Sequence, residues 1–133
     1  MKFLSWRNLH LLIGGAGLVL FMLQGQYMAR ILGVELLPDA ARMLYRSAHI
    51  YLLMACVANI AAGYFMTPVV PVSHLQRLVG IILLLVPALF IWSFFSESTS
   101  ATLDRPIAKT GLYLLFGAAV LLLLDDVRRR LRE

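Results

Sequence analysis

Four long stretches without a charged residue constrain this chain more than any other feature of its sequence. Uncharged residues fill 8–29, 47–76, 78–96 and 110–124. A helix that crosses a hydrocarbon core of about 30 Å needs about 20 mostly apolar residues, because lipid cannot hydrogen-bond a bare backbone. The last stretch is short, but Lys109 can extend it by reaching back to the headgroups with its ammonium group.

We therefore predict an all-α membrane protein with four transmembrane helices in an up-down-up-down bundle. The predicted spans are 8–29, 45–66, 75–96 and 107–125, within one domain that covers residues 1–133. Short connections between consecutive helices are typical of this topology.

Composition excludes the main alternative classes. The chain is 61% hydrophobic and 14% charged, with a mean hydropathy of +0.83. Soluble domains carry about 25% charged residues, and disordered chains combine low hydrophobicity with high net charge. A single cysteine, Cys56, excludes an intrachain disulfide framework and a Cys-based zinc site.

Local sequence signals set some of the helix ends. Pro38 and Asp39 predict that the second helix begins just before Ala40, ahead of the apolar run. Asp104 is expected to cap the fourth helix, with Pro106 in its first turn. The connection 97–105 is expected to be a polar, mobile loop.

Basic residues set the expected orientation. Seven lysines and arginines lie on the side of the two termini and five on the other side. The dense run at residues 128–132 lies next to a span, and such placement favours the cytoplasm. We expect an integral protein of the bacterial inner membrane with both termini cytoplasmic.

Polar residues inside the spans align on two helix faces. Because each residue of a helix turns by about 100°, one arc of about 140° on the second helix collects its polar and small residues. These are Arg42, Tyr45, Arg46, His49, Cys56, Asn59 and Gly63. The matching stripe of the first helix contains His10, Gly14, Gly17, Phe21, Gln24 and Met28.

These stripes predict one polar cluster near the outer leaflet, because the facing residues lie at similar depth. Its members are Gln24, Met28, Tyr45, Arg46 and His49. Polar groups in a span face other helices, where they either hold the helices together or form a site for a ligand, an ion or a redox group. Gly14, Gly17 and Asn59 are expected to serve helix packing.

Three functions remain open from the sequence. The leading hypothesis is a non-enzymatic protein that binds lipid, a second copy or a membrane partner through these faces. A second is a membrane redox carrier that binds haem b or quinone through His49, Arg46 and Gln24, with His49 and Met28 as a haem ligand pair. A third is a small-solute permease with a cavity beside Asn59 and Cys56.

Other kinds of chemistry have little support in the sequence. The three histidines are scattered along the chain, so no set of ligands for a catalytic metal converges. The basic tail is predicted to contact anionic lipid through Arg128, Arg129, Arg130 and Arg132. Basic residues are divided between the two membrane faces, which excludes a nucleic-acid-binding patch.

Overall fold

The structure is a computed structural model that describes residues 5–65, 74–99 and 103–131. Helices account for most of these residues, and no strand occurs among them. The elements are α1 (Trp6–Arg30), the short 3-10 helix η1 (Val34–Leu36), α2 (Asp39–Phe65), α3 (His74–Ser96) and α4 (Pro106–Arg130). The predicted all-α class is thus confirmed for the described residues. Each expected span falls inside one of the long helices, apart from Met66, which lies outside the described residues.

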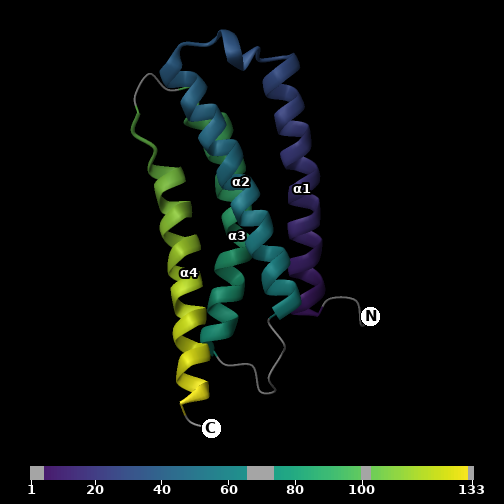
Figure 1. Cartoon of the computed structure of the whole chain (residues 1–133), viewed down its shortest axis with the longest axis vertical. Coiled ribbons are helices and arrows are strands. Elements are labelled where there is room, and N and C mark those ends of the chain that lie inside the picture. Colours follow the sequence, from purple (N-terminus) through teal and green to yellow (C-terminus); the bar gives the residue numbers. More distant parts are fainter. Residues whose placement is uncertain (1–4, 66–73, 100–102, 132–133) are drawn as a thin grey trace.

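The four long helices lie side by side along the long axis of the molecule (Figure 1). α2 and α3 pack on each other, α1 packs mainly on α2, and α4 packs mainly on α3. The first turn of α1 and the last turn of α4 lie at the same end, which we call the terminal end. The opposite end carries η1 and the start of α4, and we call it the loop end.

The starts of α2 and α4 can be compared with the starts predicted from local sequence signals. α2 begins at Asp39, within one residue of the predicted position. α4 begins at Pro106, so the predicted early proline is confirmed, but the next two amides of the helix do not donate to Asp104, the predicted cap. The amides of Ile107 and Ala108 donate instead to the carboxylate of Glu97, at 2.5 and 3.0 Å. An acid at the end of the preceding helix therefore satisfies the amides that a local cap was expected to bind.

The core consists of apolar side chains from α2, α3 and α4. Leu52, Val86 and Phe90 are fully buried in it, and the buried side chains of Leu83 and Leu115 belong to the same cluster. A second core cluster lies at the loop end and contains Met28, Val34, Tyr45, Ala48 and Phe94.

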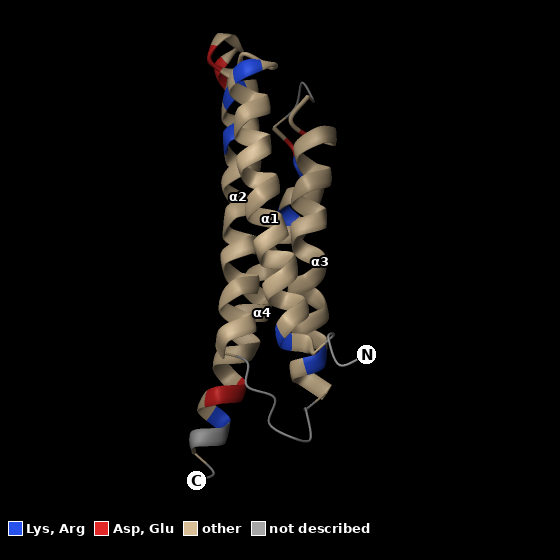
Figure 2. Ribbon diagram, turned by 90° about the vertical axis from the view of Figure 1, so that its right-hand side faces the viewer, with Lys and Arg blue, Asp and Glu red and all other residues tan. Residues whose placement is uncertain are grey.

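The outer surface is apolar over the middle of all four long helices. Each of these helices has an apolar side chain near its middle that is more than half exposed: Val19, Val57, Leu85 and Phe116. Charged residues gather toward the two ends of the molecule (Figure 2). Within the described residues, four helices are long and apolar enough to cross a membrane. Exposed apolar helix surface of this extent is the expected form of a protein surrounded by lipid.

Candidate functional site

Gln24 of α1 and His49 of α2 form the centre of the predicted polar cluster. The His49 Nδ1 atom lies 2.9 Å from the Gln24 Oε1 atom. The His49 ring also stacks on Phe21, with ring centroids 3.9 Å apart and planes only 10° apart. The ring edge faces Gly25, where an added Cβ atom would lie 3.4 Å from Nε2. The His49 side chain of α2 is thus held by three residues of α1, of which Phe21 and Gln24 belong to the predicted stripe.

The other three predicted members make different contacts. Met28 and Tyr45 belong to the core cluster at the loop end, where the Tyr45 ring meets Phe94 edge to face at 5.2 Å. Arg46 reaches away from the helix pair to the carboxylate of Glu35 at 2.5 Å, and both side chains are more than half exposed. The structure therefore divides the five residues among a hydrogen-bonded pair, an apolar cluster and a surface ion pair.

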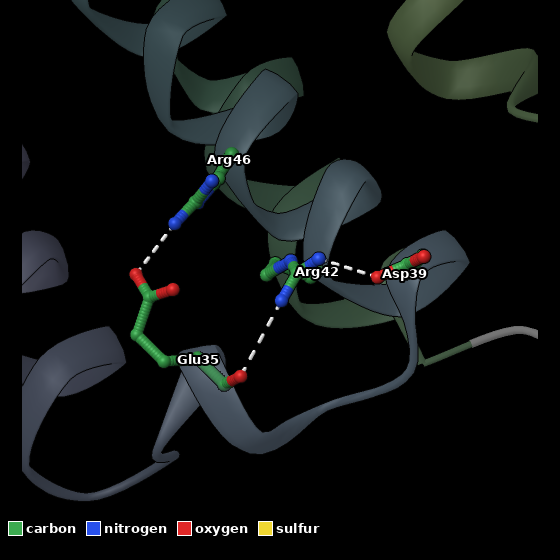
Figure 3. Close-up of polar contacts among 4 residues, drawn as sticks. All are labelled: Glu35, Asp39, Arg42 and Arg46. Atoms are coloured by element: carbon green, nitrogen blue, oxygen red, sulfur yellow. Dashed lines mark hydrogen bonds and ion pairs between the residues drawn. The ribbon is translucent and has the colours of Figure 1, made fainter.

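The arginines at the start of α2 form a surface network with η1 (Figure 3). Arg42 pairs with the carboxylate of Asp39 and also donates to the backbone carbonyl of Glu35 at 3.4 Å. Arg46 approaches the Glu35 side chain from one turn further along α2. Ion pairs at this level of exposure each stabilise a fold by about 0–1 kcal/mol. The network anchors the α1–α2 connection and forms no enclosed site.

His10 and Asn59 form a second buried polar group, toward the terminal end. The His10 Nδ1 atom lies 2.8 Å from the Asn59 Oδ1 atom. Asn59 donates both of its amide hydrogens, to the Ala55 carbonyl at 2.9 Å and to the Leu83 carbonyl at 2.7 Å. Since Asn59 has no further donor, His10 Nδ1 carries the proton and donates it. This network joins α1, α2 and α3 at one point.

The remaining ring nitrogen of His10 faces α3. Its Nε2 atom is buried and has no hydrogen-bond partner among the described residues. A Cβ atom added at Gly80 would lie 3.3 Å from it, and the Trp6 ring lies 6.3 Å from the His10 ring between centroids. His10 and Asn59 belong to the two facing stripes predicted from the sequence, but their pairing was not predicted.

The glycines expected at the α1–α2 interface are in close contact with α2. A Cβ atom at Gly14 would lie 2.9 Å from the Cys56 carbonyl oxygen, and one at Gly17 would collide with the Cys56 thiol. Gly14 and Gly17 thus allow the two backbones to approach, as small residues do in membrane helix pairs. Asn59 and Cys56 are completely buried, and neither lines the larger groove described below.

A polar cluster that was not predicted from the sequence lies at the loop end. Arg105, only 7% exposed, donates to the hydroxyls of Ser47 on α2 and Ser93 on α3, the latter at 3.3 Å. Ser93 in turn donates to the Glu97 carboxylate at 2.5 Å. The guanidinium also lies 5.7 Å from the centre of the Tyr51 ring. Glu97 and Arg105 are the two ends of the connection that was predicted to be polar and mobile. Both ends are polar, but they are buried and hydrogen-bonded, and the mobility of the connection stays a prediction.

Electrostatics differ between this buried cluster and its exposed neighbours. Burial lowers the pKa of the Arg105 guanidinium, while the Tyr51 and Glu97 side chains act in the opposite direction. Asp104 is fully exposed and accepts a hydrogen bond from Lys109 at 2.6 Å, which lowers the pKa of the Asp104 carboxyl. The opposite charges of Glu97 and Arg105 at the two ends of one short connection were the sequence signal that could have revealed the cluster.

A groove with a volume of about 790 Å³ opens between α2 and α4, which make few contacts with each other. Its walls are small and apolar residues of α2 and α4, with Leu83 of α3 among them. Ala61 lies on the α2 wall and Ala119 on the α4 wall. The polar residues along it are Gln76, Asp125 and Asp126, all near the terminal end. A smaller cavity of about 210 Å³ lies between α1 and α3 and includes Gln24.

Cofactor and metal sites gain no support from this geometry. Among residues 5–65, 74–99 and 103–131 no group of three or more His, Cys, Asp or Glu side chains could hold a metal ion. His49 directs Nε2 at the α1 backbone near Gly25, and Met28 packs in the apolar cluster with Phe94. A haem placed between His49 and Met28 would have to displace α1.

Only part of the basic tail lies within the residues that the structure describes. The Arg128 side chain is exposed at the end of α4, next to Asp125 and Asp126. The side chains of Arg129 and Arg130, and the whole of Arg132, lie outside the described residues. The predicted contact with anionic lipid therefore stays a prediction.

The comparisons with known proteins add no functional assignment. The chain matches no protein-family model, no curated protein and no solved structure.

Proposed function

We propose that this chain is a non-enzymatic integral membrane protein that binds a lipid in the groove between α2 and α4. The observation that carries the proposal is the groove itself, about 790 Å³ of mostly apolar space between α2 and α4. Ligand pockets commonly have volumes of about 300–1,000 Å³ and mostly apolar walls. A binding function needs no convergent catalytic set.

The buried polar residues support a packing role in this proposal. Gln24 with His49, and His10 with Asn59, each use their polar atoms to bind a neighbouring helix. Such interhelical bonds are worth about 0.6–2 kcal/mol in membrane proteins. They hold α1, α2 and α3 together, so that the groove lies against a fixed wall.

We further propose the membrane arrangement. The helices form an up-down-up-down bundle in a bacterial inner membrane, with the terminal end and both termini in the cytoplasm. The excess of basic residues on the terminal side, together with Arg128 beside the last apolar turn, supports this orientation. It places the groove in the inner leaflet.

The test is to fill the groove from one wall. Ala119→Phe places a ring in the groove, whereas Gly117→Phe places the same ring on the same helix at a position where an added Cβ atom meets nothing within 4 Å. The purified full chain is transferred to detergent, and retained phospholipid is counted by native mass spectrometry. We expect retained lipid in the unmodified chain and in Gly117→Phe, and none in Ala119→Phe.

Equal lipid retention by all three proteins would contradict the proposal. Loss of a co-purifying protein in Ala119→Phe, with lipid unchanged, would also contradict it, because the groove would then be a site for a protein partner. Circular dichroism of each variant checks that the helices are retained.

A further inference from the structure

The dimensions of the groove indicate which part of a membrane fits it. On α2 the groove extends from Leu53 to Phe65, which is about 18 Å at 1.5 Å per residue. Half of a hydrocarbon core about 30 Å thick is about 15 Å. The groove is therefore about as long as one leaflet is deep, and it begins at the terminal end of the helices.

The distribution of polar residues along the groove matches a phospholipid. The walls of the groove are apolar over most of its length, and polar residues line it only toward the terminal end. A phospholipid has the same division, with apolar acyl chains inside the membrane and a polar headgroup at its surface.

Charge at the terminal end of the groove favours one kind of headgroup. Asp125 and Asp126 line the groove there together with Gln76, and the exposed Arg128 follows within one turn. An ethanolamine headgroup carries an ammonium group that donates hydrogen bonds and, next to it, an anionic phosphate. The carboxylates complement the ammonium group, and the arginine complements the phosphate.

We propose that the groove selects an inner-leaflet phospholipid with a primary ammonium headgroup, such as phosphatidylethanolamine. This inference rests on the proposed lipid-binding function and adds the identity of the headgroup. The acyl chains lie between Ala61 and Ala119, and the ammonium group donates to the carboxylates of Asp125 and Asp126. A choline headgroup bears the same charge but has no N–H to donate, so it binds more weakly.

The experiment measures headgroup preference on the full chain. Delipidated protein in micelles receives phosphatidylethanolamine, its N-methylated derivatives, phosphatidylcholine or phosphatidylglycerol with identical acyl chains, and bound lipid is counted by native mass spectrometry. We expect phosphatidylethanolamine to bind about fivefold more tightly than phosphatidylcholine or phosphatidylglycerol, the factor typical of one charged contact at a membrane surface. Affinity should fall with each added methyl group.

Variants at the acidic residues test the assignment of the contact. The double variant D125A/D126A removes the acceptors of the ammonium group, so it should still bind lipid but with equal affinity for the ethanolamine and choline headgroups. Asp39→Ala is the control, because Asp39 is an exposed carboxylate at the loop end that pairs with Arg42. It should keep the preference unchanged. The methylation series on the unmodified chain gives an answer even if the double variant does not fold.

The outcomes separate the two proposals. Lipid bound with no headgroup preference, or a preference that survives D125A/D126A, overturns this inference and leaves lipid binding intact. Absence of bound lipid with every headgroup overturns the proposed function as well. Preference for phosphatidylglycerol would assign the headgroup contact to the arginines and would also overturn the inference.

Discussion

Replacing Asn59 by leucine removes the polar group that joins three helices, and its cost can be worked out from the structure. The substitution removes two interhelical hydrogen bonds, to His10 and to the Leu83 carbonyl. Each is worth about 0.6–1.7 kcal/mol in a membrane protein. It also leaves the buried Nδ1–H group of His10 without an acceptor, which costs about 1–3 kcal/mol. We expect Asn59→Leu to lower the free energy of unfolding by about 2–6 kcal/mol.

A double-mutant cycle with His10→Phe tests this reasoning. The two single substitutions each leave the partner with an unsatisfied buried group, and the double substitution removes both groups. We therefore expect the double variant to be more stable than the sum of the single effects by about 1–2 kcal/mol, as is usual for residues in direct contact. Unfolding is measured by titrating a denaturing detergent into mixed micelles.

The control for this cycle is Thr110→Leu. The Thr110 hydroxyl is exposed and donates to the Pro106 carbonyl within α4. Its replacement should change stability by less than about 0.5 kcal/mol. Strictly additive effects of Asn59→Leu and His10→Phe, or an Asn59→Leu variant as stable as the unmodified chain, would refute the proposed network.

Three further predictions follow from other contacts. Gly17→Ala should destabilise the α1–α2 pair by about 1–3 kcal/mol, because the added Cβ atom collides with a thiol on α2. Gly15→Ala should leave stability unchanged, because its Cβ atom meets nothing within 4 Å. Equal unfolding curves for the two variants would contradict this prediction. Glu97→Gln should cost about 1–3 kcal/mol, because the carboxylate accepts from two amides of α4 and one hydroxyl; an unchanged thermal midpoint would contradict it. Lys109→Met should raise the pKa of the Asp104 carboxyl toward its ordinary value, as measured by NMR titration. In the unmodified chain, the stability that this pair adds should be lost as the pH falls through the pKa of Asp104 in the folded state. An Asp104 titration that is the same in both proteins would contradict the pairing.

The sequence predicts the helices well because their signals are local. Uncharged stretches, Pro38 with Asp39, and Pro106 each act on neighbouring residues, and the helices begin and end close to these positions. Helical periodicity also places Gly14 and Gly17 on the face that meets α2.

The contacts within the site are less predictable, because they depend on rotation and on distant partners. Gln24 and His49 were expected to be near each other and do meet, since both point straight into one helix interface. Arg46 lies on the edge of the same polar arc, and Glu35 of the connection draws its long side chain outward.

The hydrogen bonds of Glu97 are a second case in which sequence rules do not predict the partner. Its partners on α4 are ten and eleven residues further along the chain, beyond the range of any capping motif. Sequence rules for helix ends therefore point to Asp104, which is nearer, while the tertiary fold brings the more distant carboxylate to the amides.

An experimental structure of the full chain in a lipid nanodisc that contains phosphatidylethanolamine would test the lipid-binding groove most directly. We predict ordered acyl-chain density between Ala61 and Ala119, with a headgroup beside Asp125 and Asp126 at the terminal end. Direct packing of α2 on α4, or a helix of a second molecule in the same space, would contradict it.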